Sequence, residues 1–184
     1  MGKKILIFLF VLALFFIGYT KYIRMLTLEK TLVAQWTLIE SEYRHKSDVI
    51  FDMSRYINSN SETEINLLEQ VRKARNIAAQ IKIDPKKISA AELEQFSKAY
   101  KQLIDLQTKL QQIGRSSQQI GESQEYREFL AELEGIEIRI ANERRRLNEQ
   151  VAIYNKYING FFNIAFAQVF GFHDWPVFMP ILGE

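Results

Sequence analysis

No glycine or proline occurs between Tyr19 and Asp84, a stretch that covers more than a third of the 184-residue chain. Because these two residues interrupt helices most strongly, a long stretch without them favours long helices over loops and turns. The whole chain has only eight glycines and three prolines, which argues against a loop-rich sandwich or barrel. No segment alternates apolar and polar residues for long enough to predict a strand. The sequence therefore predicts an all-α protein.

A strongly apolar segment begins before this stretch. Lys3-Lys4 is followed by an uncharged run from Ile5 to Thr20, which is the layout of a signal sequence. The run is short for a span of about 20 residues, but long lysine side chains at its ends can reach the interface. It lacks a convincing cleavage site, so we predict an uncleaved anchor over residues 1–24 in preference to a removed signal peptide or a buried core helix. The flanking basic residues nearly balance, so charge alone leaves the orientation open.

Residues 25–171 are predicted to form an elongated, antiparallel up-down helical bundle whose first helix continues from the anchor. That first helix spans Leu26 to Ile57. A capping box, Ser61-x-x-Glu64, opens the second helix, which ends at Asp84-Pro85 because the residue before a proline avoids the α region. A second capping box, Ser89-x-x-Glu92, opens the third helix, and Gly114 is expected to end it.

The last predicted helix is the most regular. Its apolar residues recur three or four apart from Phe129 to Ala165, with one gap at Glu143/Arg144. Such a seam predicts packing against long partner helices at a shallow angle. Taken to Phe170, this helix would be about 70 Å long, which is enough to return from the far end of the bundle to the membrane.

The segment Phe162–Leu182, which includes most of an aromatic C-terminal tail (172–184), would then lie at the membrane. More than half of the aromatic residues lie in 1–22 or 157–178, and aromatic side chains favour the membrane interface. One hypothesis is that this segment docks on the bilayer surface or on a membrane partner. The other is that it folds back and plugs the open end of the bundle. The first hypothesis assigns membrane contact to Phe162, Phe166, Phe170, Phe172, Trp175 and Phe178.

Little in the sequence points to chemistry. The absence of cysteine excludes disulfides, thiol catalysis and cysteine-ligated metals. Glu42-x-x-His45 has the spacing of a di-iron ligand pair, but the only other histidine, His173, has no such partner. No glycine-rich phosphate loop is present, and a net charge of +2 gives no general attraction to nucleic acid. We therefore predict no catalytic residue, no metal and no cofactor.

Three polar residues lie at the seam of the last helix. Arg144 falls in its gap and, if buried, needs a carboxylate, for which Asp48, Glu64 and Glu69 are candidates. Asn148 and Asn155 are seven residues apart and therefore share a face. We interpret Arg144, Asn148 and Asn155 as setting the register of packing rather than as a ligand site.

The region around these residues has a recognisable pattern, carried by Glu137, Ile140, Arg144, Asn148, Val151, Tyr154 and Asn155. It resembles the signature of the LemA family of bacterial membrane-anchored helical proteins. Three other segments also resemble the family. They contain Trp36 and Asp48, then Glu64 and Arg75, and, near the C-terminus, Ala167, Gly171 and Phe172. Phe51-Asp52 replaces the family's usual Pro-Asn and Phe162 replaces a proline, so the chain resembles a divergent member.

The resemblance implies one N-terminal membrane helix, a bundle outside the cytoplasm and no established enzymatic activity. We predict a non-enzymatic, single-pass protein of the bacterial inner membrane, with its N-terminus inside and its periplasmic bundle acting as a scaffold or adaptor for envelope proteins. The alternative is a structural protein that assembles with itself on the membrane. Expected partners are the membrane and envelope proteins or further copies of the chain, with no nucleic acid or small-molecule substrate. Residues assigned a structural or interaction role are Trp36, Asp48, Arg75, Glu137, Arg144, Asn148, Tyr154 and Asn155.

Overall fold

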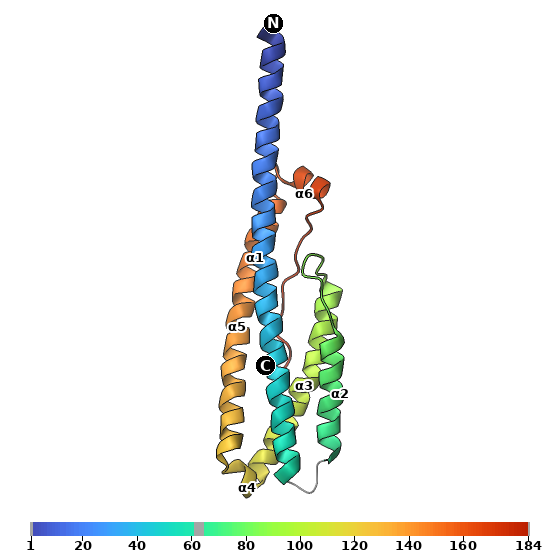
Figure 1. Ribbon diagram of the computed structural model, residues 1–184, viewed down its shortest axis with the longest axis vertical. Helices are drawn as coiled ribbons and strands as arrows, with labels where there is room; N and C mark the ends of the chain where they lie inside the picture. Colours follow the sequence, from blue (N-terminus) through green and yellow to red (C-terminus); the bar gives the residue numbers. More distant parts are fainter. Residues whose placement is uncertain (1, 61–64, 184) are drawn as a thin grey trace.

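The computed structural model describes residues 2–60 and 65–183, and this part of the chain is all-helical, with no strand. Its helices are α1 (Gly2–Asn60), α2 (Ile65–Gln80), α3 (Ala90–Ser116), α4 (Gln118–Gly121), α5 (Gln124–Ile158) and α6 (Ile164–Phe170). The long helices run up and down beside one another, and α1 projects far beyond the rest (Figure 1). The predicted elongated, antiparallel bundle is confirmed.

α1 is one unbroken helix of 59 residues, which corresponds to about 88 Å. Its first part is exposed on every side, with large apolar side chains uncovered from Ile5 to Ile17. The first fully buried side chain is that of Met25, and burial then recurs along one face through Leu32, Trp36 and Ile39 to Ile57. The predicted anchor and the first bundle helix therefore form one continuous helix.

α5 lies antiparallel to α1 along the length of the bundle (Figure 1). Ion pairs mark the register, because Glu42 accepts from Arg139 at 3.0 Å and His45 lies 3.0 Å from Glu132. α2 and α3 pack against each other and against α1. The apolar faces of these helices form one continuous core, as the seams in the sequence predicted.

The predicted capping box at Ser89 is confirmed. The Ser89 hydroxyl accepts the Glu92 backbone N–H at 3.2 Å, and the Glu92 carboxylate accepts the Ser89 backbone N–H at 2.8 Å. The other predicted box, Ser61-x-x-Glu64, lies outside the described residues.

Gly114 does not end α3, which continues to Ser116. This glycine serves packing instead. The ring of Tyr126 at the start of α5 lies so close that a Cβ on Gly114 would be 2.3 Å from Tyr126 Cζ. The Tyr126 hydroxyl donates to the Gln111 carbonyl at 2.9 Å, which fixes the ring in place.

Gly114→Ala is therefore expected to lower the free energy of unfolding by about 1–3 kcal/mol, because a buried and hydrogen-bonded ring must move. Gly135→Ala is the matched control on α5, where the new Cβ would meet only Arg139 Nη1 at 3.5 Å. There the gain in helix propensity, at most about 1 kcal/mol, should stabilise the protein. Chemical denaturation of the full chain in detergent, followed by circular dichroism, measures both. Equal effects at the two glycines would contradict the close packing.

The last long helix is shorter than predicted. α5 ends at Ile158, and a turn over residues 159–163 separates it from α6. Asn159 and Gly160 disfavour helix. The Tyr157 carbonyl accepts the Gly160 backbone N–H at 3.2 Å and the Asn163 side-chain amide at 2.8 Å. Gly171 ends α6 in the left-handed conformation, with φ of 77°, and the chain then turns back along the bundle (Figure 1).

Candidate functional site

The tail after Gly171 runs back along the bundle in an extended conformation without helix or strand (Figure 1). Every third side chain is buried: those of Phe172, Trp175, Phe178 and Ile181. A period of three is that of a polyproline II helix, and Pro176 and Pro180 favour this conformation. The tail therefore completes the core of the bundle.

Two asparagines of α5 hold the backbone of this tail. Asn148 donates its side-chain amide to the Phe178 carbonyl at 2.9 Å and accepts the Phe178 N–H at 2.9 Å. Asn155 does the same for Trp175, at 2.8 Å to the carbonyl and 3.0 Å from the N–H. We call Asn148 and Asn155 the asparagine clamp. Each amide satisfies both polar groups of one tail residue, as a neighbouring strand would.

The spacing of the clamp matches the tail. Seven residues of α-helix rise about 10.5 Å, and three residues of a polyproline II helix rise about 9.3 Å. Two amides seven residues apart can therefore hold two tail residues three apart. The asparagines set a register, but the partner is the tail rather than a neighbouring helix.

Beneath the clamp lies a cluster of aromatic rings from three parts of the chain. The Phe178 ring from the tail lies 5.5 Å from that of Trp36 on α1 and 6.0 Å from that of Phe96 on α3, measured between centroids. Tyr43 and Tyr100 extend the cluster along the same helices. Trp36 and Tyr43 have no exposed surface, so the tail seals the centre of the bundle.

This arrangement corrects part of the predicted membrane contact. Phe172, Trp175 and Phe178 are buried against the helices, because their spacing of three places them on the inner face of the tail. They are therefore covered by the protein itself, and the tail runs along the helices rather than plugging the open end of the bundle (Figure 1). Phe162 and Phe170 are exposed, at 76% and 50%. Phe166 is half-buried, and its ring lies over Gly18 of α1.

The exposed residues of this region lie beside α1 where it leaves the bundle. We call Phe161, Phe162, Val169 and Phe170 the collar, and each is at least half exposed. The Lys21 ammonium donates to the Asn163 side chain, and the Phe170 ring lies 5.0 Å from that of Tyr22. These contacts fix the collar at the end of the uncharged run of α1.

The model of the LemA family matches residues 35–180. The chain belongs to the LemA family. The match begins just before Trp36 and ends at Pro180, so it includes both the clamp and the part of the tail that the clamp holds. No curated protein matches the chain.

Two other residues of the LemA resemblance are brought together by the fold. Arg75 of α2 donates to Asp48 of α1 through Nε at 3.1 Å and Nη2 at 2.7 Å. Its guanidinium also lies 4.8 Å from the centre of the Phe51 ring. This pair joins α1 to α2 on the outside of the bundle, so Asp48, one of the three candidate partners for Arg144, is paired with Arg75 instead.

Lys46 carries a buried charge in this LemA bundle. Its side chain is 1% exposed, and its ammonium lies 3.0 Å from Glu137. Glu137 also accepts from Gln107 at 3.1 Å. Arg144, in contrast, is only half-buried. Of its other candidate partners, Glu69 pairs with Arg72 at 2.6 Å, and Glu64 lies outside the described residues.

The Glu42-x-x-His45 motif of α1 also forms contacts between helices. Glu42 pairs with Arg139, and His45 with Glu132. Among residues 2–60 and 65–183, no group of three side chains is arranged to bind a metal ion. The motif therefore joins α1 to α5 in the observed fold.

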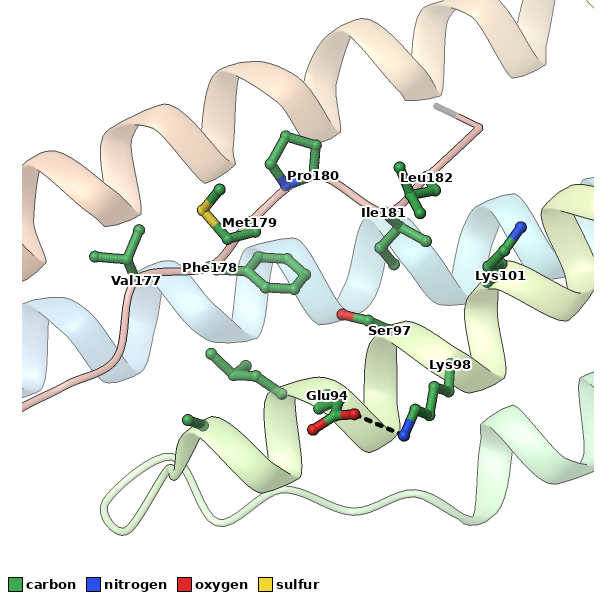
Figure 2. Close-up of a pocket in the computed structure, with 12 residues that line it drawn as sticks. Glu94, Ser97, Lys98, Lys101, Val177, Phe178, Met179, Pro180, Ile181 and Leu182 are labelled. Carbon is green, nitrogen blue, oxygen red and sulfur yellow. Dashed lines mark ion pairs between the residues drawn. The ribbon is translucent and has the colours of Figure 1, made fainter.

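A groove of about 440 Å³ lies between the first half of α3 and the tail from Val177 to Leu182. Figure 2 shows these tail residues opposite α3, with Glu94 and Lys98 paired on the α3 side at 2.6 Å. Val177, Met179 and Leu182 are exposed at 56%, 68% and 76%. The outer face of the clamped tail is thus an apolar surface of the kind that another protein can contact.

Burial raises the pKa of three tyrosines in this core. The pKa of Tyr100 is raised to about 12, and those of Tyr126 and Tyr154 are also raised. The fold favours the neutral phenol. Its contribution to the free energy of unfolding is therefore fully present below the unfolded-state pKa of about 10, and it is lost as the pH rises from 10 toward 12.

We therefore expect the wild-type chain to lose about 2–3 kcal/mol of stability between pH 10 and 12 through Tyr100. Tyr100→Phe should lose correspondingly less over the same range. Denaturation midpoints of the full chain in detergent, measured across this range, test the difference. Parallel curves for the two proteins would contradict the burial of this phenol.

Proposed function

We propose that this LemA protein is a non-enzymatic, single-pass membrane protein of the bacterial inner membrane whose bundle is a scaffold or adaptor for other envelope proteins. In this proposal the N-terminus lies in the cytoplasm and the bundle on the extracytoplasmic side. The proposal rests on family membership together with the arrangement of the first helix.

The observation that carries the proposal is the continuity of α1. It is the one helix in the described residues that is long and apolar enough to cross a membrane, and its apolar part is not buried in the protein. Covering these side chains with lipid is strongly favourable. The same helix then forms the centre of the bundle without a break, so a membrane anchor here holds a rigid rod upright.

The polar side chains support a structural role. Glu42, His45 and Asp48 on α1 all bind residues of α5 or α2. These groups hold helices together. The groove beside Val177 and Met179 supplies the surface on which we expect a partner to bind.

Site-specific photo-crosslinking in intact cells tests this role. A photoreactive residue is placed at Met179 on the groove, and at Ile153 of α5, which is 49% exposed, as the control. We expect Met179 to give products with another envelope protein that Ile153 does not give. Products containing only two copies of this chain would favour the self-assembly alternative over the adaptor. Absence of any product specific to Met179 would contradict a partner at the groove.

Location needs its own measurement. Carbonate extraction should leave the full chain in the membrane pellet, and protease added to intact spheroplasts should digest the bundle. Recovery of the chain in the soluble fraction would refute the anchor, and a protease-resistant bundle would refute the orientation.

A further inference from the structure

A second cavity lies at the opposite end of the tail, where the bundle meets the anchor. It has a volume of about 550 Å³ and lies between α1, the connection from α2 to α3, and the start of the tail. Charged groups that line it are Glu29, Lys86, Lys87 and Asp174, and Tyr22 and Phe170 provide aromatic surface. Figure 1 shows the connection between α2 and α3 at the end of the bundle that carries α6.

The depth of this cavity follows from the length of the anchor. A span of about 20 residues counted from Lys4 ends near Arg24. Glu29 is then about 8 Å farther out, which is close to the outer edge of a headgroup layer about 5–7 Å thick. Tyr22 and Phe170, whose rings are 5.0 Å apart, lie on the membrane side. The cavity therefore opens at the level of the phospholipid headgroups.

The two lysines of the cavity, Lys86 and Lys87, extend into solvent from the connection between α2 and α3. Lys86 and Lys87 are exposed, and within the part of the chain that the structure describes their ammonium groups form no ion pair. The backbone N–H of Lys86 donates to Asp84 at 3.0 Å, which shapes the connection that carries both lysines. Two neighbouring ammonium groups on a short turn suit a phosphate group.

The two acidic residues of the cavity, Glu29 and Asp174, lie close to the buried phenol of Tyr154. Glu29 is half-buried, and burial raises its pKa against the opposing charges of Lys86 and His173. After burial, the charges of Glu29 and Asp174 contribute to the raised pKa of Tyr154. Asn159 donates to Asp174 at 2.6 Å and holds it in place. The cavity thus presents both signs of charge beside aromatic rings.

We propose that this cavity binds the headgroup of a zwitterionic phospholipid that carries a primary amine, of the phosphoethanolamine type. Lys86 and Lys87 receive the phosphate, while Glu29 and Asp174 receive the ammonium beside the Tyr22 and Phe170 rings. A purely anionic headgroup would meet two carboxylates in the same cavity. The inference rests on the proposed membrane anchor and adds to it a lipid specificity.

The test uses the full chain in nanodiscs of phosphatidylethanolamine and phosphatidylglycerol, with native mass spectrometry to count the lipids that remain bound after release. Lys86→Ala/Lys87→Ala should reduce retention of phosphatidylethanolamine about tenfold or more. Lys73→Ala/Lys109→Ala, at two exposed lysines of α2 and α3 that do not line the cavity, is the matched control and should retain as much as wild type. Glu29→Gln should reduce the preference for phosphatidylethanolamine over phosphatidylglycerol. Circular dichroism melting confirms that each variant is folded.

Equal retention by the two double variants would overturn the site while leaving the anchor intact. Equal retention of the two lipids by wild type would overturn the zwitterionic assignment. Equally strong binding of soluble glycerophosphoethanolamine without a bilayer would show a soluble phosphate ligand and overturn the lipid source. Extraction of the wild-type chain by carbonate would refute the anchor, and the lipid site with it.

Discussion

Phe178→Ala is expected to lower the free energy of unfolding by about 3–5 kcal/mol, the usual cost of removing a buried phenylalanine ring. The Phe178 side chain is 1% exposed and lies within aromatic contact of Trp36, Tyr43 and Phe96. These rings belong to α1 and α3, which cannot move into the space left by the Phe178 ring without losing contacts with their other partners. The space should therefore remain as a cavity in the variant.

The next residue provides the control. Met179 is 68% exposed on the opposite face of the tail, so Met179→Ala should change stability by less than about 0.5 kcal/mol. Guanidinium denaturation of the full chain in detergent, followed by tryptophan emission, measures both variants. The chain has only two tryptophans, Trp36 and Trp175, and both are buried where the tail meets the helices. A small effect of Phe178→Ala, comparable to that of Met179→Ala, would contradict the buried tail.

Loss of the asparagine clamp should have the second largest effect. Asn148→Ala/Asn155→Ala removes four hydrogen bonds to the tail backbone. At about 1 kcal/mol for each bond, the expected loss is about 4 kcal/mol. Asn142→Ala, at an exposed asparagine of the same helix, is the matched control and should have little effect.

Hydrogen exchange gives a readout that general destabilisation does not. The N–H groups of Trp175 and Phe178 donate to the clamp, so their exchange should accelerate in the double variant far more than that of amides in the middle of α5. Asn155→Asp distinguishes the two hydrogen bonds of this asparagine. The carboxylate still accepts the Trp175 N–H, but it cannot donate to the Trp175 carbonyl and repels it. Uniform acceleration across α5 and the tail would argue against a local clamp.

The helices of this protein were predictable because their signals are local. The spacing of apolar residues along α1 and α5 and the capping box at Ser89 depend on neighbours a few residues apart. The end of the second helix is predicted less well, because α2 ends at Gln80 rather than at Asp84-Pro85. The family resemblance drew on the same stretches. Gly114 was misinterpreted because the ring that requires it, that of Tyr126, lies on another helix.

The role of the tail was harder to foresee because its period is neither that of a helix nor that of a strand. Phe172, Trp175 and Phe178 were grouped with exposed collar residues because all are aromatic and near the end of the chain. The spacing of three, with Pro176 and Pro180 between buried positions, is the signal that separates them. Asn148 and Asn155 were recognised as setting a register, but no local pattern names the segment that they hold. The burial of Lys46 has no local signal, because its partner Glu137 is far away in sequence.

The unbroken course of α1 makes it a lever arm. If the proposed span ends near Arg24, the helix from Arg24 to Asn60 extends about 54 Å beyond the membrane, and membrane helices tilt by about 20° on average. A change of that size in the tilt of the anchor would sweep the distal tip sideways by about 20 Å. Bilayer thickness, acting on a few turns of helix, would then be converted into the reach of the far end across the membrane surface.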